Sequence, residues 1–320
     1  MKYAGLDLLR GLAAFGIVGC HLALQPWTDA YWRIHELCDV NVGVFAAVSG
    51  FLMWTPESFP RLPKYIEKRF RRLVPIYLLW SLVFILFGFV FDAFVRHSIN
   101  PKWLDWSFYP KVIFGGQASA HLWFLICLFY VQSTVACCAG VLRRLNGTVL
   151  FMIGLFAVWV ASIYHDVWMF GYPVRMFGFV LAGCALRMTV GNRKTLSWRK
   201  TTWYAIVAAS LALLHYVSGH DLVPLFVKDY LLVLPIFLAF IYLPVRDGLL
   251  SVFASRLGST SLGVYLVHPI ITAGVGIVVR EVFRTPFGLA AMFFDWTISY
   301  IIALVITCVL LHIPFTKKCI

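Results

Sequence analysis

Charged residues are scarce in this chain of 320 residues, and acidic residues are the scarcest of them. Asp, Glu, Lys and Arg together make up 13% of the sequence, whereas 61% is hydrophobic and the mean hydropathy is +0.85. No soluble domain has this balance. The 14 acidic residues face 27 basic ones, and a net charge of +13 would indicate nucleic acid binding in a soluble protein. Here the basic residues are first a guide to membrane topology, and no nucleic acid partner is expected.

Common catalytic and ligand-binding motifs are also missing. The sequence contains no GxSxG, P-loop, HExxH or GxGxxG motif. Its eight cysteines form no CxxC pair and no Cys/His ligand spacing, so neither a zinc site nor a disulfide framework is expected. Cys38 is the one cysteine that we place in an outer loop. Ordinary numbers of Gly (23) and Pro (14) exclude collagen and low-complexity sequence.

Ten apolar segments are long enough, or nearly long enough, to cross a bilayer. The sequence therefore predicts an all-α integral membrane protein of about ten transmembrane helices, forming one domain over residues 1–320. The first apolar run is longer than a signal-peptide core and has no clear cleavage site, so we expect it to be retained. The predicted spans are 8–26, 39–55, 73–93, 120–141, 149–165, 172–190, 203–219, 229–245, 259–279 and 290–312.

Basic residues assign the two faces of this bundle. Nineteen of the 27 Lys and Arg residues fall on the side that also carries both termini, and by the positive-inside rule that side is cytoplasmic. The longest outer loop, 94–119, is rich in aromatic residues and can form either an interfacial belt or a lid over a cavity. The outer face is expected to hold Arg33, Arg96, Lys102, Lys111, Arg175, Lys228, Arg280 and Arg284.

The first span carries ionisable residues at both ends. Arg10 and His21 are eleven positions apart, which is within about 20° of three helical turns, so they lie on one stripe about 16 Å apart. Ionisable groups within a membrane normally face the bundle interior and have a function. The alternative is that Arg10 extends to the headgroups and His21 lies at the other interface. Asp7, three residues before Arg10, can form an ion pair with it.

A second group of basic residues precedes the third span. Arg69 and Arg72 are three residues apart and share a helix face, whereas Arg71 points elsewhere. Two guanidinium groups at the cytoplasmic side can bind phosphate oxygens in a bidentate manner. The alternative is an ordinary anchor on anionic lipid.

Two further histidines lie at a depth similar to that of His21. His121 begins the fourth span, and His268 shares a helix face with Tyr265 in the ninth. A single intramembrane histidine usually has a packing role, but three at similar depth each need a polar partner. His312 ends the last span and is expected to be interfacial. Ser49 is a buried polar residue, and its neighbour Gly50 permits close approach of another helix.

These short motifs occur together in an order that resembles the bacterial membrane acyltransferase family 3. Each motif is weak alone, but six in order over nearly the whole chain are specific. The motifs are Asp7-x-x-Arg10-Gly, Arg10-x10-His21, Ser49-Gly50-Phe51, Arg69-x-x-Arg72-x-x-Pro75, His121-Leu-Trp123-Phe and Ser261-x-x-x-Tyr265-x-x-His268.

The resemblance implies a multi-pass protein of the bacterial inner membrane that moves an acyl group, usually acetyl, from cytoplasmic acyl-CoA to a hydroxyl. The acceptor would be a cell-surface or lipid-linked glycan, such as an O-antigen, capsule or exopolysaccharide unit. The chain ends soon after Pro314, so the SGNH domain of many family members is not expected. Whether the protein forms a homo-oligomer is left open. The alternative function is a transporter or flippase that carries out no acyl transfer.

On this resemblance, Arg10, Arg69 and Arg72 would hold the phosphates of acetyl-CoA, which is the donor substrate, and no metal is required. His21 would act at the thioester, either as a general base or as a transient acyl carrier. His121, Tyr265 and His268 would orient His21 or the acceptor, or stabilise the oxyanion.

Overall fold

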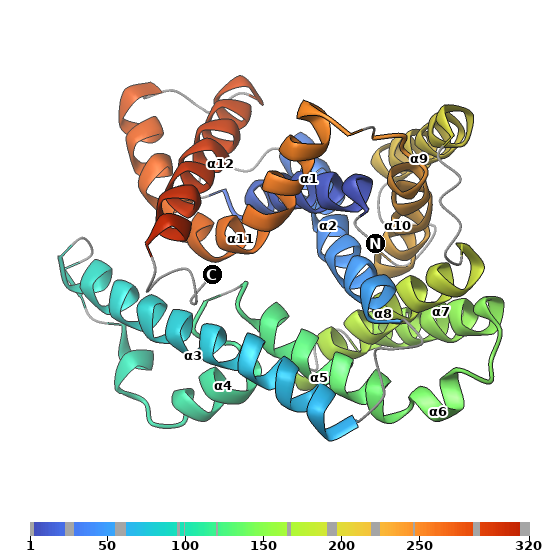
Figure 1. Cartoon of the computed structure of the whole chain (residues 1–320). Coiled ribbons are helices and arrows are strands. Elements are labelled where there is room, and N and C mark those ends of the chain that lie inside the picture. Colours follow the sequence, from blue (N-terminus) through green and yellow to red (C-terminus); the bar gives the residue numbers. More distant parts are fainter. Residues whose placement is uncertain are drawn as a thin grey trace.

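The computed structural model describes residues 3–22, 29–54, 62–94, 97–98, 100–119, 121–164, 168–190, 197–218, 225–245, 247–283 and 289–313. Every regular element in these ranges is a helix, so the all-helical prediction is confirmed (Figure 1). The elements are α1 (Ala4–Cys20), α2 (Asp29–Met53), α3 (Leu62–Phe94), the 3₁₀ helix η1 (Pro101–Leu104), α4 (Phe108–Gly115), α5 (Trp123–Cys137), α6 (Ala139–Leu142), α7 (Gly147–Ile163), α8 (Trp168–Val190), α9 (Trp198–Ser218), α10 (Leu225–Ile241), α11 (Leu249–Phe283) and α12 (Leu289–His312).

The helices are those of a multi-pass membrane protein. Each of the ten predicted apolar segments overlaps a helix in its described part, and the fourth is shared between α5 and the short α6. Within the described ranges, five helices are long and apolar enough to cross a membrane, namely α2, α3, α8, α11 and α12. Three shorter apolar helices lie in α5, α7 and α10. The count of ten spans and the cytoplasmic position of both termini stay predictions.

Helix α1 lies at the centre of one half of the bundle, where it packs against α2, α10, α11 and α12 (Figure 1). The small residues of α1 allow these four helices to approach it closely. A Cβ atom added at any of four glycines would come within 2.6 Å of an atom from a neighbouring helix, and each glycine faces a different one. These glycines are Gly5 (facing α10), Gly11 (α11), Gly16 (α2) and Gly19 (α12).

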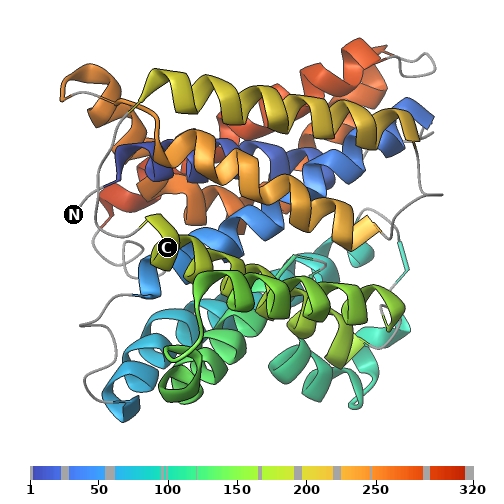
Figure 2. The ribbon, with the colours of Figure 1, turned by 90° about the vertical axis from the view of Figure 1, so that its right-hand side faces the viewer.

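The other half of the bundle is built from α3, α5, α7 and α8. Helix α5 packs against both α3 and α8, and α8 in turn packs against α2 and α7. Figure 2 shows α9 and α10 running side by side along one flank of the molecule. The contacts of α5 and α8 thus connect this half to the helices around α1.

The predicted outer loop is largely structured, and its aromatic residues do not form a single exposed belt. Trp103 in η1 and Phe108 in α4 are buried. The indole of Trp103 donates a hydrogen bond of 2.7 Å to the carboxylate of Asp92 on α3. The hydroxyl of Tyr77 on α3 donates to the backbone of α4 at Val112. The segment is therefore fastened to α3.

Helices α2 and α8 approach each other closely at two facing glycines, as predicted at Gly50. A Cβ added at Gly50 would lie 2.0 Å from the carbonyl oxygen of Val180, and one added at Gly183 would lie 1.9 Å from that of Ala47. Neither backbone atom can move away without separating the helices. The pair therefore sets the distance between α2 and α8.

We expect Gly183→Ala to destabilise the protein by about 1–3 kcal/mol, because the added methyl group overpacks this contact. The measurement is the thermal midpoint of the purified protein in detergent. Gly274→Ala on α11 is the matched control, since nothing lies within 4 Å of a Cβ there. A Gly183→Ala midpoint equal to that of the control variant would show that the contact is not tight.

Candidate active site

Three histidines that are far apart in the sequence meet in one cluster. The ring centroids of His21 and His268 are 5.1 Å apart, and those of His121 and His268 are 5.2 Å apart. His21 and His121 are separated by 6.2 Å. Tyr265 completes the group, with its ring 5.3 Å from that of His121. The structure thus brings together four of the residues that the sequence singled out.

A proline fixes the orientation of His268. Pro269 is inside α11 and has no backbone N–H. The carbonyl oxygen of Tyr265, four residues before it, therefore lacks its usual helical donor, and Nδ1 of His268 occupies that place at 2.7 Å. Because Nδ1 donates to a carbonyl, Nε2 carries the lone pair. The His268-Pro269 pair is a sequence signal for this arrangement that the predicted motifs did not include.

His121 is held from two sides. Its Nδ1 lies 3.0 Å from the hydroxyl oxygen of Ser119, and its backbone carbonyl accepts a hydrogen bond from the hydroxyl of Tyr265. Both His121 and His268 are buried. Within the described ranges, the Nε2 atoms of these two histidines have no hydrogen-bond partner. Buried polar atoms are normally paired, so two free imidazole nitrogens beside His21 are typical of a reactive site.

The cluster opens into a cavity of about 240 Å³, which we call the histidine pocket. His21, in the turn that ends α1, is half-buried and lies on its wall. The aromatic rings of Trp123 and Tyr172 face each other on the same wall, with centroids 4.4 Å apart. The full lining is Ile17, Cys20, His21, His35, Asp39, Val42, His121, Trp123, Phe124, Tyr172, Arg175 and Tyr265.

A second cavity, of about 200 Å³, contains the predicted arginines, and we call it the arginine pocket. Arg10, Arg69 and Arg72 all line it, so the structure joins the first span to the basic segment of α3. Arg71 lies elsewhere, as predicted, and forms an exposed ion pair of 2.7 Å with Glu67. The full lining is Arg10, Phe45, Val48, Ser49, Leu52, Arg69, Arg72, Leu73, Phe124, Leu125, Leu128, Gln132 and Leu262.

The arginine pocket has an excess of positive charge. Arg10 lies 3.7 Å from Asp7, as the sequence predicted. The Nε of Arg69 donates to the hydroxyl of Tyr65 at 3.1 Å. In the part of the chain that the structure describes, neither Arg69 nor Arg72 forms an ion pair with a carboxylate. The pocket is therefore suited to an anionic ligand.

Helix α1 and Phe124 connect the two pockets. Arg10 lines the arginine pocket and His21 lines the histidine pocket, and the helix between them rises about 16 Å. Phe124 on α5 lines both cavities. Its ring lies 5.5 Å from that of Tyr265 and 6.2 Å from that of Phe45. A single aromatic side chain therefore stands where the two cavities adjoin.

Arg175, which the sequence assigns to the outer face, does not lie on the exposed surface of the protein. It is buried on α8, and its Nη2 donates to Asp39 on α2 at 2.5 Å and to Asp229 on α10 at 2.9 Å. Asp229 is itself fully buried. Because α2 begins at Asp29, Cys38 also lies inside this helix and is buried, not in an outer loop. The three charged residues tie α2, α8 and α10 together at the wall of the histidine pocket.

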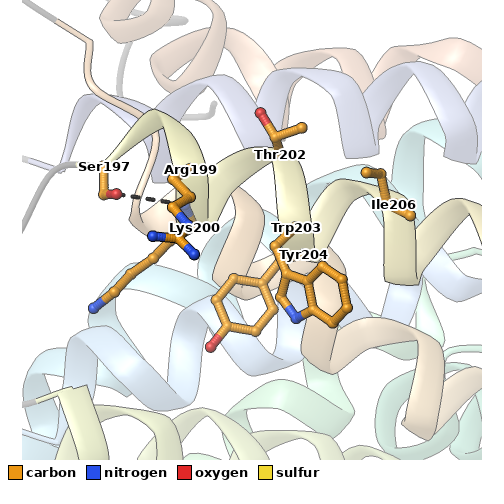
Figure 3. A pocket seen from close by; sticks show the side chains of 7 residues that line it. All are labelled: Ser197, Arg199, Lys200, Thr202, Trp203, Tyr204 and Ile206. Carbon is orange, nitrogen blue, oxygen red and sulfur yellow. Dashed lines mark hydrogen bonds between the residues drawn. The ribbon is translucent and has the colours of Figure 1, made fainter.

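A larger hollow of about 680 Å³ lies at the start of α9 and has a different character (Figure 3). Its walls come from α9 and from Ser197 just before it, and they include Arg199, Lys200, Trp203 and Tyr204. Figure 3 draws the hydrogen bond of 3.4 Å from the backbone N–H of Lys200 to the hydroxyl of Ser197. Basic and aromatic side chains together are typical of a headgroup anchor, and the lining of this hollow contains none of the clustered histidines.

Comparisons with known proteins indicate an acyltransferase. A family model described as an acyltransferase domain, acyltransferase 3, matches residues 3–313. The curated protein "Acyltransferase MdmB" from Streptomyces mycarofaciens is 25% identical over 315 residues, a match that covers 84% of this chain and 78% of that protein. No solved structure matches.

Proposed function

Because this chain belongs to the acyltransferase 3 family, we propose that it transfers an acetyl group from acetyl-CoA to a hydroxyl of a glycan. Membership in this family favours acyl transfer over the transporter or flippase that the sequence also allowed. In this proposal the arginine pocket opens to the cytoplasm and binds the donor, whereas the histidine pocket opens to the other side and binds the acceptor. The protein would lie in the bacterial inner membrane.

The observation that carries this proposal is the pair of adjoining pockets with different chemistry. The arginine pocket presents Arg10, Arg69 and Arg72, which suit the phosphates of CoA. CoA cannot cross a bilayer, but its thin pantetheine arm can extend along α1 toward His21. The thioester would then lie near Phe124, where both cavities are lined by one side chain. Each substrate thus reaches the reaction from its own pocket.

His21 is the residue that we assign to proton transfer. The acceptor hydroxyl gives its proton to the imidazole while its oxygen bonds to the thioester carbonyl carbon. The carbon–sulfur bond then breaks, and the leaving thiolate takes the proton to give free CoA. In the alternative covalent route the acetyl group is first held on the imidazole and then passed to the acceptor. The free Nε2 atoms of His121 and His268 lie beside this reaction and can relay the proton.

The walls of the histidine pocket support a glycan as the acceptor. Trp123 and Tyr172 give the pocket apolar aromatic surface against which a sugar can pack, and Asp39 offers carboxylate oxygens that accept hydrogen bonds from hydroxyl groups. Ligand sites commonly combine aromatic surface with a few placed polar groups in this way. The cavity would hold one sugar unit of a longer glycan.

We expect Arg69→Ala to raise the KM for acetyl-CoA by about 10- to 100-fold with little change in kcat, because it removes a charge-assisted contact to phosphate. Acetyl transfer to a glycan acceptor at varied acetyl-CoA measures this. Arg71→Ala is the matched control, since Arg71 points away from the pocket and pairs with Glu67. Equal KM values for the Arg69 variant and the wild type would remove Arg69 from the donor site.

Binding of CoA gives a test that does not depend on the acceptor. A ligand that binds only the folded state raises its apparent stability. Saturating CoA should therefore raise the thermal midpoint of the wild-type protein, and much less that of Arg69→Ala. The absence of a shift in the wild type would contradict a CoA site.

A further inference from the structure

A buried amide side chain in the arginine pocket has a polar atom without a partner. Gln132 on α5 is 1% exposed and lines the pocket. One end of its side-chain amide donates to the hydroxyl of Ser49 on α2. The other end, Oε1, has no hydrogen-bond partner among the described residues. Nearly all buried polar groups in folded proteins are paired, and leaving one unpaired costs free energy, so this atom requires an explanation.

Among the described residues, no neighbouring side chain supplies the missing partner of Gln132 Oε1. The polar residues that line the pocket are the three arginines, Gln132 and Ser49. All its other lining residues are apolar. A leucine or methionine would pack at this place without the cost of an unpaired amide. A ligand that enters the pocket and offers a hydrogen-bonding group to the free end would remove that cost.

The separation of Gln132 from Phe124 indicates which part of a donor Gln132 meets, since the two are eight residues apart on α5, a rise of about 12 Å. The arginines suit the phosphates, and Phe124 borders the histidine pocket where the thioester would lie. The pantetheine arm between these two groups carries two amide groups, and a hydroxyl group near its phosphate end. An amide N–H can donate to Oε1 of Gln132, and the side-chain amide of glutamine can also donate if it is turned over.

We propose that Gln132, oriented by Ser49, recognises an amide group of the pantetheine arm. This inference rests on the proposed function, because it needs a CoA thioester in the arginine pocket. It gives a role to Ser49, which the sequence singled out without a function. It also makes the site selective for pantetheine thioesters over simple acyl thioesters, in addition to the phosphate contacts.

The test compares two small donors that lack phosphates, in the wild type and in Gln132→Met. S-acetyl-N-acetylcysteamine keeps one amide of the arm, and an acetyl thioester of the same length with an ether in place of the amide keeps none. We expect the wild type to use the amide donor with a kcat/KM about 3- to 10-fold higher, which is the worth of one neutral hydrogen bond. Gln132→Met should lose this preference and raise the KM for acetyl-CoA by a similar factor.

The controls separate this inference from a structural role and from the proposed function. Thr134→Val alters an exposed hydroxyl two residues further along α5, bonded to the carbonyl of Tyr130, and should leave the preference unchanged. Gln132→Met should keep or raise the thermal midpoint without donor, and Ser49→Ala should weaken the preference as a second variant. A wild type without preference, or a Gln132→Met protein that keeps it, would overturn the inference while acetyl transfer persists. A wild type that uses no acetyl thioester, acetyl-CoA included, would overturn both.

Discussion

Replacing His21 with alanine is expected to lower acetyl transfer by about 10²- to 10⁴-fold, the usual contribution of a positioned acid–base residue. His21 ends α1 and is the half-buried histidine on the wall of the histidine pocket, whereas His121 on the same wall is buried and His268 is outside the lining. Removal of its ring takes away the group that would accept the proton of the acceptor. CoA binding should persist, because the arginine pocket does not include His21. Acetyl transfer to a glycan acceptor and the CoA-dependent thermal shift measure the two effects separately.

The matched control is His312→Ala. His312 ends α12, is exposed, and bonds through Nδ1 to the carbonyl of Cys308 at 2.7 Å. The His312→Ala variant should transfer acetyl groups at the wild-type rate. Near-normal transfer by the His21 variant would contradict the mechanism, and loss of both transfer and CoA binding would indicate a structural role for His21.

The second large effect concerns stability. Arg175→Leu should lower the free energy of unfolding by about 3–5 kcal/mol, because it leaves Asp39 and the buried Asp229 without their shared cation. The loss would act on three helices at once, since these residues lie on α8, α2 and α10. Denaturant unfolding of the purified protein in detergent measures it.

Two further variants make this prediction specific. Arg71→Leu breaks the exposed pair with Glu67 and should cost about 1 kcal/mol or less. Adding Asp229→Asn to Arg175→Leu should recover part of the lost stability, because it removes one of the two uncompensated charges. A cost for Arg175→Leu no larger than that of Arg71→Leu would show that the buried network contributes little.

The sequence predicted the helices better than their ends. Each of the ten apolar segments overlaps a helix in the part that the structure describes, because a backbone in lipid must satisfy its own hydrogen bonds. However, α2 begins at Asp29, ten residues before the predicted start. Polar residues such as Glu36 and Asp39 lower the hydropathy of its first half. Asp39 lines the histidine pocket and pairs with Arg175. A helix that supplies polar residues to a site has a shorter apolar run, so the sequence predicts a span shorter than the helix.

The candidate site was partly predictable for the same reason. His21, His121 and His268 stood out because a charged or imidazole group in an apolar run is costly. Arg175 and Asp229 follow the same rule, but Arg175 was counted only as an outer-face cation by its place near a span end, and its ion pairs with Asp39 and Asp229 were not predicted. Gln132 carries no charge, so the cost of burying a charge did not identify it in the sequence. Only the structure reveals its contact with Ser49 and its unpaired amide end.

The most direct test of the central claim is the release of free thiol from acetyl-CoA by the purified protein in detergent, without acceptor. It is measured for the wild type, His21→Ala and Arg69→Ala. The two-pocket account predicts slow release by the wild type, in which water or the imidazole of His21 takes the acetyl group. It predicts loss of release in His21→Ala at any acetyl-CoA concentration, and recovery of Arg69→Ala at high acetyl-CoA. Mass spectrometry of the protein after reaction then distinguishes the covalent route, which leaves an added acetyl group. No release by the wild type, together with no thermal shift from CoA, would contradict an acetyl-CoA-dependent acyltransferase.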